Sequence, residues 1–149
     1  MPDRYRRVVV AIDCSEDSRR VLARAASIAG NGDSELHIVH VIEPLALAYG
    51  ADVPMDVSEL QNSLLAQARD NAKTFATEFG IPEQRIHVEL GSIEKTIRQL
   101  ADRIPADLIV VGSHTRSGLA LLLGSTARGL VPGAHCDVLA VKVDQQESA

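Results

Sequence analysis

The sequence contains no tryptophan and few other aromatic residues, which together make up 3% of its 149 residues. Valine, isoleucine, leucine and alanine must therefore build the core, and this composition is typical of buried parallel strands. Cysteine is scarce as well, since Cys14 and Cys136 are the only two and cannot form a disulfide framework. No apolar run reaches the length of a membrane span or of a signal-peptide core, so we expect a cytoplasmic protein with no membrane partner.

Positive charge is also in short supply, because 15 basic side chains stand against 20 acidic ones and leave a formal net charge of -5. Such a balance repels phosphate backbones at long range. Arg4, Arg6 and Arg7 cluster near the start, but they directly precede an apolar run and are more simply a solvated segment. The composition therefore argues against nucleic acid as a partner.

Motifs of dedicated catalysis are missing too. The chain carries no GxxxxGK[ST] loop, no GxGxxG after an expected strand and no paired nucleophile and base. Its histidines form no metal-binding pattern, because His37 and His40 stand three apart on one expected strand and face opposite sides. His87 alternates with Ile86 and Val88 as an outward residue would. We expect neither a zinc site nor an enzyme, while slow ATP hydrolysis stays open.

Apolar runs alternate with helical patterns from one end of the chain to the other. The expected strands are 8–12, 36–42, 85–90, 107–111 and 138–143, and the expected helices are 15–29, 60–79, 93–104 and 125–131. This order predicts an α/β fold: a doubly wound five-stranded parallel sheet of the flavodoxin or Rossmann-like type, with strand order 3-2-1-4-5 and helices on both faces. We expect one domain over residues 1–149, of which 144–149 form a disordered tail.

Two local patterns carry predictions about the helices. Ser15 offers a cap for the first helix, and Glu16 and Asp17 follow in the first turn, where the helix dipole favours acids. The second helix shows apolar residues at helical spacing, which predicts that they form its buried face. These residues are Leu60, Leu64, Ala68, Ala72, Phe75 and Phe79.

Ligands in folds of this kind bind at the carboxyl ends of the strands, where the strand order reverses. In the order 3-2-1-4-5 that point falls between the first and fourth strands, which places Asp13 beside Gly112. Asp13 has the alternative role of a plain helix cap. Cys14 follows it, and a helix dipole can lower the pKa of a thiol, but without a neighbouring base a packing role is the better interpretation.

The segment after the fourth strand is rich in groups that suit phosphate. Residues 112–118 leave the strand with a glycine at each end, and Gly124, Ser125 and Thr126 open the next helix. Glycine lets a backbone approach a phosphate closely, and a helix N-terminus presents free N–H groups. A serine at a helix start is also an ordinary cap, so phosphate binding and simple capping both remain open.

Four segments together resemble the universal stress protein family in its single-domain bacterial form. They are VVVAID at 8–13, GSHTRSGL at 112–119, LLGSTAR at 122–128 and CDVLAVK at 136–142. The match covers essentially the whole chain. The resemblance implies a stress-response protein that is usually a homodimer and that, in one branch of the family, binds ATP.

The ATP-binding branch has a loop pattern that this sequence follows only in part. The pattern is Gly, two residues, Gly, nine residues, and Gly followed by Ser or Thr. Gly112 and the Gly124-Ser125 pair match it, but Thr115 replaces the second glycine and only eight residues separate it from Gly124. A β-branched threonine resists positive φ, and losing one residue shortens the reach of the loop by up to ~3.5 Å. The other branch binds no nucleotide.

By position, the resemblance implies a set of nucleotide-binding residues and a ligand, ATP with Mg²⁺. Asp13 would contact the ribose or a nucleotide-bound Mg²⁺, Val41 would meet the adenine through its backbone, and Arg116 would supply positive charge. The full set is Ile12, Asp13, Val41, Gly112, Thr115, Arg116, Gly124, Ser125 and Thr126. We expect a stress-response regulatory protein that binds ATP or another adenine nucleotide without dedicated catalysis. The alternative is a dimer that binds no nucleotide and acts through an unknown protein partner.

The last expected strand predicts how two copies would associate. In the order 3-2-1-4-5 it lies at an edge of the sheet, although nearly all of its residues are apolar. An exposed edge of this kind favours pairing with a second chain, and a symmetric homodimer would cover it. The predicted dimer edge comprises Val138, Leu139, Ala140, Val141 and Val143, with Lys142 as a charge that limits further pairing.

Overall fold

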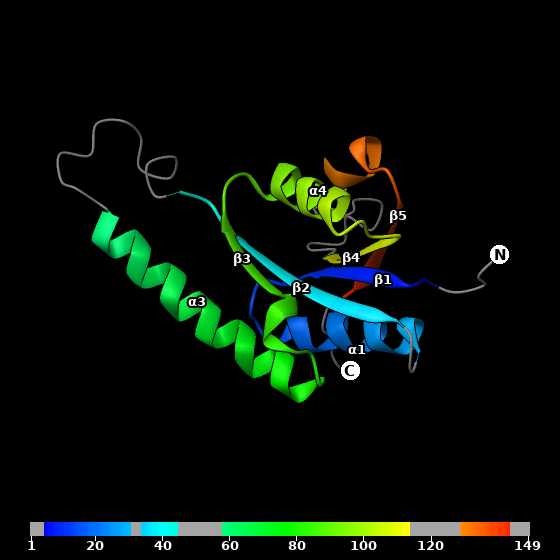
Figure 1. Ribbon diagram of the computed structural model, residues 1–149, viewed down its shortest axis with the longest axis horizontal. Helices are drawn as coiled ribbons and strands as arrows, with labels where there is room; N and C mark the ends of the chain where they lie inside the picture. The colour runs from blue at the N-terminus through cyan, green and yellow to red at the C-terminus, as the bar shows by residue number, and fades with distance from the viewer. Residues whose placement is uncertain (1–4, 31–33, 45–57, 114–128, 144–149) are drawn as a thin grey trace, which may run out of the picture.

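The computed structural model describes residues 5–30, 34–44, 58–113 and 129–143, and Figure 1 shows their arrangement. Strands and helices alternate along the chain. The elements are β1 (Arg7–Ala11), α1 (Asp17–Ala29), β2 (Glu35–Ile42), α3 (Ser58–Glu78), the 3-10 turn η1 (Glu83–Arg85), β3 (Ile86–Leu90), α4 (Ile93–Arg103), β4 (Leu108–Ser113), the 3-10 turn η2 (Val131–Gly133) and β5 (Asp137–Lys142).

The five strands form one parallel sheet in the order β3-β2-β1-β4-β5, so the predicted topology is confirmed. Strand β1 lies at the centre, where Val8 pairs with Leu36 of β2 on one side and with Leu108 of β4 on the other. The strand order reverses at β1. The carboxyl ends of β1 and β4 therefore mark the switch point of the sheet.

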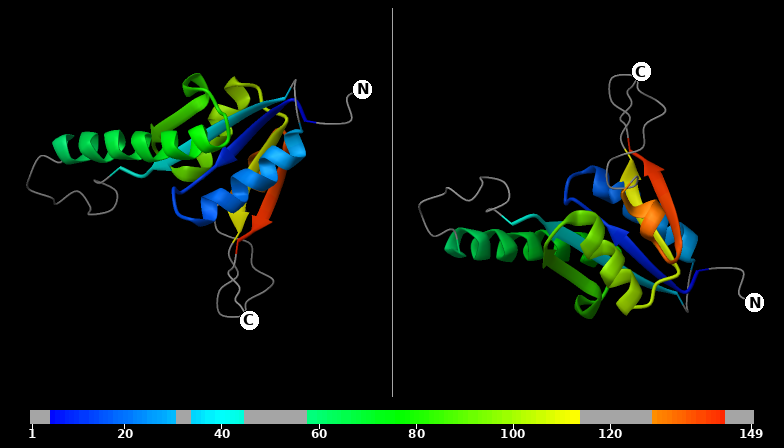
Figure 2. Two further views of the ribbon diagram at one scale, coloured as in Figure 1. Left: turned by 90° about the horizontal axis from the view of Figure 1, so that it is seen from below. Right: turned by 90° about the horizontal axis from the view of Figure 1, so that it is seen from above.

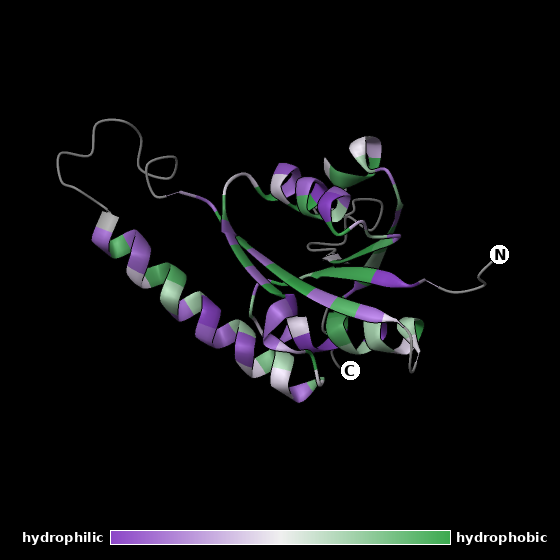
Figure 3. Ribbon diagram, viewed as in Figure 1, coloured by the Kyte–Doolittle hydropathy of each residue, from purple (hydrophilic) through white to green (hydrophobic). Residues whose placement is uncertain are grey.

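Helices cover both faces of the sheet, with α1 and α3 on one face and α4 on the other (Figures 1 and 2). The period-two alternation of strands divides the core accordingly. Val8 and Val10 of β1 belong to the core cluster that includes α1 and α3, whereas Val9 belongs to the cluster that includes α4. All three are fully buried. Figure 3 shows apolar residues concentrated along the sheet. Because helices bury the sheet on both faces, its strands are rich in valine and isoleucine.

The start of α1 differs from the prediction that Ser15 caps the helix. The residue at the cap position is Glu16, and it makes no side-chain capping bond. The Ser15 hydroxyl instead donates to Oδ1 of Asp13 over 2.6 Å, because the carboxylate two residues earlier competes for it. The other end of α1 follows expectation, since Gly30 adopts a φ of 75° and ends the helix there.

Helix α3 buries only part of the predicted stripe. Ala68, Ala72 and Phe75 are buried, but Leu60 is 54% exposed, so its assignment to the buried face was wrong. The amino-terminal part of α3 extends past the edge of the sheet (Figures 1 and 2). An apolar side chain there keeps its helical spacing but has no sheet beneath it.

The carboxyl-terminal region is described from Gly129 onward. Gly129 and Leu130 are helical and lead into η2, whereas 125–128 of the expected helix and the tail 144–149 lie outside the described residues. Leu130 is fully buried in the core cluster on the α4 side. Strand β5 follows and pairs with β4 over its whole length, so the last strand lies where the sequence predicted it.

Candidate functional site

A cavity of about 200 Å³ lies at the carboxyl ends of β1, β2 and β4. Its wall is formed by Ala11, Ile12, Asp13, Asp17, Ser18, Val21, Val39, His40, Val41, Ile93, Ile97, Val111, Gly112 and Val143. We refer to this cavity as the crevice. Because β1 and β4 meet there, the crevice occupies the switch point of the sheet, and the predicted proximity of Asp13 and Gly112 is confirmed.

Four of the predicted site residues line the crevice: Ile12, Asp13, Val41 and Gly112. The other five fall outside the described part of the chain, and these are Thr115, Arg116, Gly124, Ser125 and Thr126. The structure therefore brings together four of the nine predicted residues, including Asp13 and Val41, which the resemblance relates to the ribose or Mg²⁺ and to the adenine, and Gly112, which it relates to the phosphates. That these residues bind a nucleotide stays a prediction.

Asp13 is held in a short turn between β1 and α1. Its Oδ1 atom accepts hydrogen bonds from the Ser15 hydroxyl at 2.6 Å, the Ser15 N–H at 3.0 Å and the Ser18 hydroxyl at 3.0 Å. The Asp13 N–H in turn donates to the Ser18 oxygen over 3.2 Å. Cys14, at the tip of this turn, has a φ of 63°, which non-glycine residues adopt rarely. The carboxylate is thus fixed in position by its neighbours, and it is not the residue that caps α1.

The charged side chains among the described residues of the crevice are both carboxylates. Burial raises the pKa of the Asp13 carboxyl, but the hydrogen bonds from Ser15 and Ser18 outweigh it and hold the pKa below its ordinary value of 3.8. Asp13 is therefore ionised near neutral pH. A second carboxylate, that of Asp17 in the first turn of α1, also lines the crevice. Such a pair favours hydroxyl groups or a hydrated cation over a bare anion.

His40 is a crevice residue that the sequence did not reveal. Its Nδ1 atom lies 2.8 Å from the Ile12 carbonyl oxygen, and because a carbonyl only accepts, Nδ1 donates. The Ile12 N–H donates to the Val39 carbonyl over 2.9 Å. Strand β2 therefore bonds to both backbone groups of Ile12, through the Val39 carbonyl and the His40 side chain, and so fixes the residue directly before Asp13. The sequence signal for this role is that His40 directly precedes Val41, a predicted site residue near the end of an expected strand.

The floor of the crevice is apolar and tightly packed. Ile12, Val39 and Val111 are at most 6% exposed. A Cβ atom added at Gly112 would stand 3.2 Å from Cγ2 of Val21, so a methyl group fits at this position only if Val21 shifts by a few tenths of an ångström. An apolar floor with a few fixed polar groups is the usual construction of a small-molecule site.

The thiol of Cys14 is not activated. Burial, together with the nearby charge of Asp13, raises its pKa to about 11, so the effect of the helix dipole considered above does not prevail. The thiol stays protonated at neutral pH. Cys14 packs against the core cluster on the α1 side, which agrees with the packing role.

The described residues offer neither a metal site nor a membrane-spanning helix. They contain no group of three or more His, Cys, Asp or Glu residues that could hold a metal ion. None of the helices in these same ranges is long and apolar enough to cross a membrane.

The side chains of the predicted dimer edge differ in how deeply they are buried. This strand lies at the edge of the sheet, and Val138, Leu139 and Ala140 are half-buried. Val141 and Val143 are only 7% and 2% exposed, because their side chains pack into the core on the α1 side. An apolar surface along β5 would therefore be formed by Val138, Leu139 and Ala140, and the predicted role of this strand as a dimer edge stays a prediction.

Comparison with known proteins gives concordant results. The model of the universal stress protein family matches residues 4–142. Universal stress protein A homolog 1 of Coxiella burnetii is 37% identical over 139 residues, covering 92% of this chain and 96% of the relative. The hypothetical protein MJ0577 shares the fold with a TM-score of 0.76 at 21% identity, covering 97% of this chain and 99% of its own. A universal stress protein solved in complex with cAMP is 28% identical with a TM-score of 0.58, covering 95% and 100%.

Proposed function

The chain belongs to the universal stress protein family, and we propose that it is a stress-response regulator that binds ATP or another adenine nucleotide in the crevice, without dedicated catalysis. One observation carries this proposal. A carboxylate fixed by three hydrogen bonds, that of Asp13, stands at the rim of an apolar cavity at the switch point of the sheet. Folds of this type bind their ligands at that point.

The crevice suits the nucleoside half of such a ligand. Its apolar floor matches the face of a purine, and the backbone at Val41 lies beside it for polar contacts. The hydrogen bonds that the Asp13 carboxylate accepts from described residues all reach Oδ1, so Oδ2 can accept a ribose hydroxyl. The relative solved with cAMP, at 28% identity, supports an adenine nucleotide as the ligand class.

Binding of the triphosphate should depend on Mg²⁺. Asp13 and Asp17 repel a bare phosphate chain, whereas a divalent cation between them, bound by carboxylate oxygens and water, would offset the negative charge of both the carboxylates and the phosphates. From the family pattern, Gly112, Gly124, Ser125 and Thr126 would hold the phosphates, with Arg116 adding charge. In our proposal, Thr115 and the shortened spacing weaken the binding of the phosphates by this loop.

Calorimetry with Mg-ATP tests this function, with Asp13→Asn as the informative variant. Asparagine keeps an oxygen that accepts from Ser15 and Ser18 but loses the charge, so we expect the turn to survive and the Kd to rise about tenfold. Asp102→Asn, at an exposed carboxylate paired with His135 away from the crevice, is the matched control and should leave the Kd unchanged. If neither the parent protein nor a Thr115→Gly variant binds, nucleotide binding is excluded.

We also propose a homodimer formed through β5, because this edge strand presents half-buried apolar residues. Sedimentation at micromolar concentration should show a dimer for the parent protein and a monomer for Val138→Lys. Val131→Lys, at an apolar residue that is already 53% exposed, should remain dimeric. Should the chain dimerise but bind no nucleotide, its role in the cytoplasm is that of an interaction module for other proteins.

A further inference from the structure

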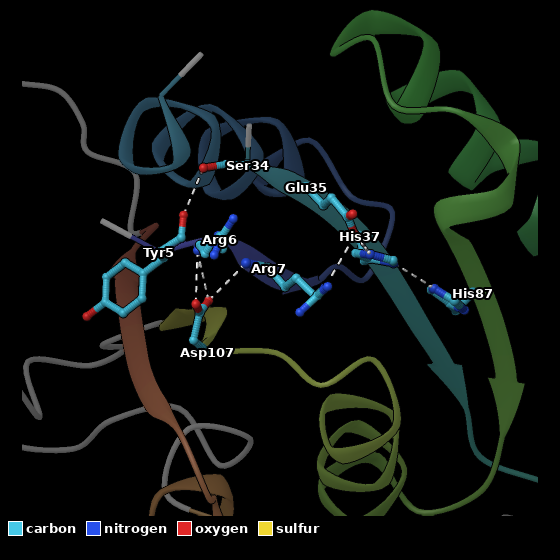
Figure 4. A network of polar contacts seen from close by, with 8 residues as sticks. All are labelled: Tyr5, Arg6, Arg7, Ser34, Glu35, His37, His87 and Asp107. Carbon is cyan, nitrogen blue, oxygen red and sulfur yellow. Dashed lines mark hydrogen bonds and ion pairs between the residues drawn. The ribbon is translucent and has the colours of Figure 1, made fainter. Parts of the chain in front are cut away.

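Three side chains form a hydrogen-bonded row across β2 and β3 (Figure 4). His37 Nε2 lies 3.2 Å from Glu35 Oε1, and His37 Nδ1 lies 3.1 Å from His87 Nε2. The two imidazole rings are close to parallel, at 20°, with centroids 5.4 Å apart. We refer to Glu35, His37 and His87 as the imidazole relay. His87 therefore does not simply face solvent as the sequence suggested, but points at the ring of His37.

The chemistry of the groups fixes where the protons are. A carboxylate only accepts, so His37 Nε2 carries the hydrogen in its contact with Glu35. In the neutral relay, His37 Nδ1 is then an acceptor and His87 Nε2 donates to it. One added proton is tolerated, because a charged His37 donates to both Glu35 and His87. A second added proton makes both rings cations and places an N–H on both His37 Nδ1 and His87 Nε2, which are 3.1 Å apart. Neither nitrogen can then accept, so the hydrogen bond between the rings is lost.

The relay spans the pairing that holds an edge strand. Strand β3 is the last strand on its side of the sheet and pairs with β2 from Ile86 to Leu90. It ends at Leu90. The next residue, Gly91, donates its N–H to the Ile42 carbonyl over 3.1 Å, and α4 then begins with Ile93, a residue of the crevice wall. The strand that the relay holds therefore leads directly into the candidate binding site.

The surroundings of the relay favour neutral imidazoles. Burial lowers the pKa of His37; Glu35 raises it in part, and Arg85 of η1 and Arg7 of β1 lower it further. Burial likewise lowers the pKa of His87, followed by the neighbouring charge of His37. Glu89 of β3 opposes this shift and Arg103 of α4 adds to it, and these two form an ion pair of 3.4 Å. Both rings thus resist charging more than exposed histidines do.

We propose that the imidazole relay is a pH-sensitive latch, which holds edge strand β3 on β2 while its rings are neutral or share one added proton, and releases β3 when both rings are charged. The contribution to stability is complete above 6.5, the ordinary pKa of histidine, and is lost as pH falls through the lower pKa values of the folded state. Local opening of one edge strand needs far less free energy than global unfolding.

Hydrogen exchange between pH 7.5 and 5.5, corrected for intrinsic exchange rates, tests the latch. We expect the protection of β3 amides relative to β1 amides to fall about fivefold, the size of one cross-strand side-chain pair. The variant His87→Gln keeps an N–H donor in the place of Nε2 but cannot take up a proton. Its β3 protection should match the parent at pH 7.5 and stay within twofold at pH 5.5. His135→Gln, which removes an exposed histidine paired with Asp102, should behave like the parent.

A second measurement needs no variant. The ¹⁵N shifts of the ring nitrogens of the parent protein should show His37 with hydrogen on Nε2 at pH 8, and titrations of His37 and His87 that depend on each other. The latch is excluded if β3 protection falls equally in the parent and in His87→Gln. It is equally excluded if the two rings titrate independently near 6.5 or if neutral His37 carries its hydrogen on Nδ1.

Discussion

The two ends of the same parallel sheet use polar side chains in opposite ways. At the carboxyl ends of the strands, Asp13 and His40 bond to the adjoining turn and backbone, and a cavity remains between them. At the amino ends, Asp107 accepts the N–H groups of Arg6 and Arg7 at 2.9 to 3.2 Å, and Glu35 and the two rings of the relay bond to one another (Figure 4).

This difference suggests that the two ends of the sheet have different roles: the amino ends stabilise the pairing of the strands, and the carboxyl ends are suited to bind a ligand. The amino-end groups use their donors and acceptors on one another and on the backbone, so they hold strands together. The carboxyl-end groups are fixed but leave acceptor capacity directed at a cavity, which is what binding a ligand requires. Substitutions at one end should therefore change affinity, and substitutions at the other should change the stability of the edge strand.

The largest effect is expected for Ser18→Val at the carboxyl end. Ser18 is 2% exposed and bonds to both the N–H and the carboxylate of Asp13, so valine removes the side-chain partner of this N–H and one of the three hydrogen bonds to Oδ1. We expect a loss of about 1–3 kcal/mol in the free energy of unfolding in urea. Ser92→Ala, at an exposed cap position whose side chain makes no capping hydrogen bond, is the control and should cost far less. Equal losses would mean that the Asp13 turn is not held as described.

His40→Phe comes next, because it removes the side-chain donor to the Ile12 carbonyl while keeping a planar ring. We expect about 1 kcal/mol less stability and a Kd for Mg-ATP about tenfold higher by calorimetry. His87→Gln should leave that Kd within twofold at pH 7.5. If instead His87→Gln weakens binding as much as His40→Phe does, the two ends are not functionally separate.

The two ends should also lose stability in different ranges of pH. The pKa of Asp13 is lowered in the folded state, so its contribution is present above 3.8 and is lost as pH falls through the folded value. The relay loses its contribution earlier, below 6.5. Urea unfolding from pH 8 to 3 should therefore show Asp13→Asn approaching the parent only at the acidic end. His87→Gln should exceed the parent in stability below about pH 6. The reverse order of the two ranges would contradict these assignments.

Gly112→Ala should have the smallest effect on stability. The added methyl group would lie 3.2 Å from Val21 and 3.6 Å from Val143, two side chains that can shift by a few tenths of an ångström. We expect less than about 1 kcal/mol of destabilisation by thermal unfolding. Because Gly112 lines the crevice, the same change should raise the Kd for Mg-ATP severalfold. Unchanged affinity would show that the ligand does not approach this wall.

Most of the fold could be predicted because its signals are local. Alternating apolar runs and helical patterns give the elements, and the handedness of parallel crossovers leaves few topologies. The burial of single side chains was harder to predict, because packing between distant parts of the chain decides it. Leu60 has the spacing of a buried residue but lies where α3 has passed the sheet. Val141 of edge strand β5, and Val143 just after this strand, pack into the core.

The candidate site could be predicted by topology but not in detail. Asp13 and Gly112 follow from the strand order alone, since the carboxyl ends of β1 and β4 must adjoin. The role of His40 depends on a contact with a residue 28 positions away, and the relay depends on a contact across 50 positions. No pattern in a single sequence links such residues, because their proximity is created by the strand register.

The most direct test of the account is amide NMR of the ¹⁵N-labelled protein during titration with Mg-ATP. We expect the resonances of Ile12, Asp13, Val41 and Gly112 to shift in a saturable way, while those of Glu35, His37 and His87 stay within the scatter of the rest of the sheet. Shifts confined to the amino ends of the strands, or no shifts at millimolar ligand, would contradict the claim that the carboxyl-end crevice is the nucleotide-binding site.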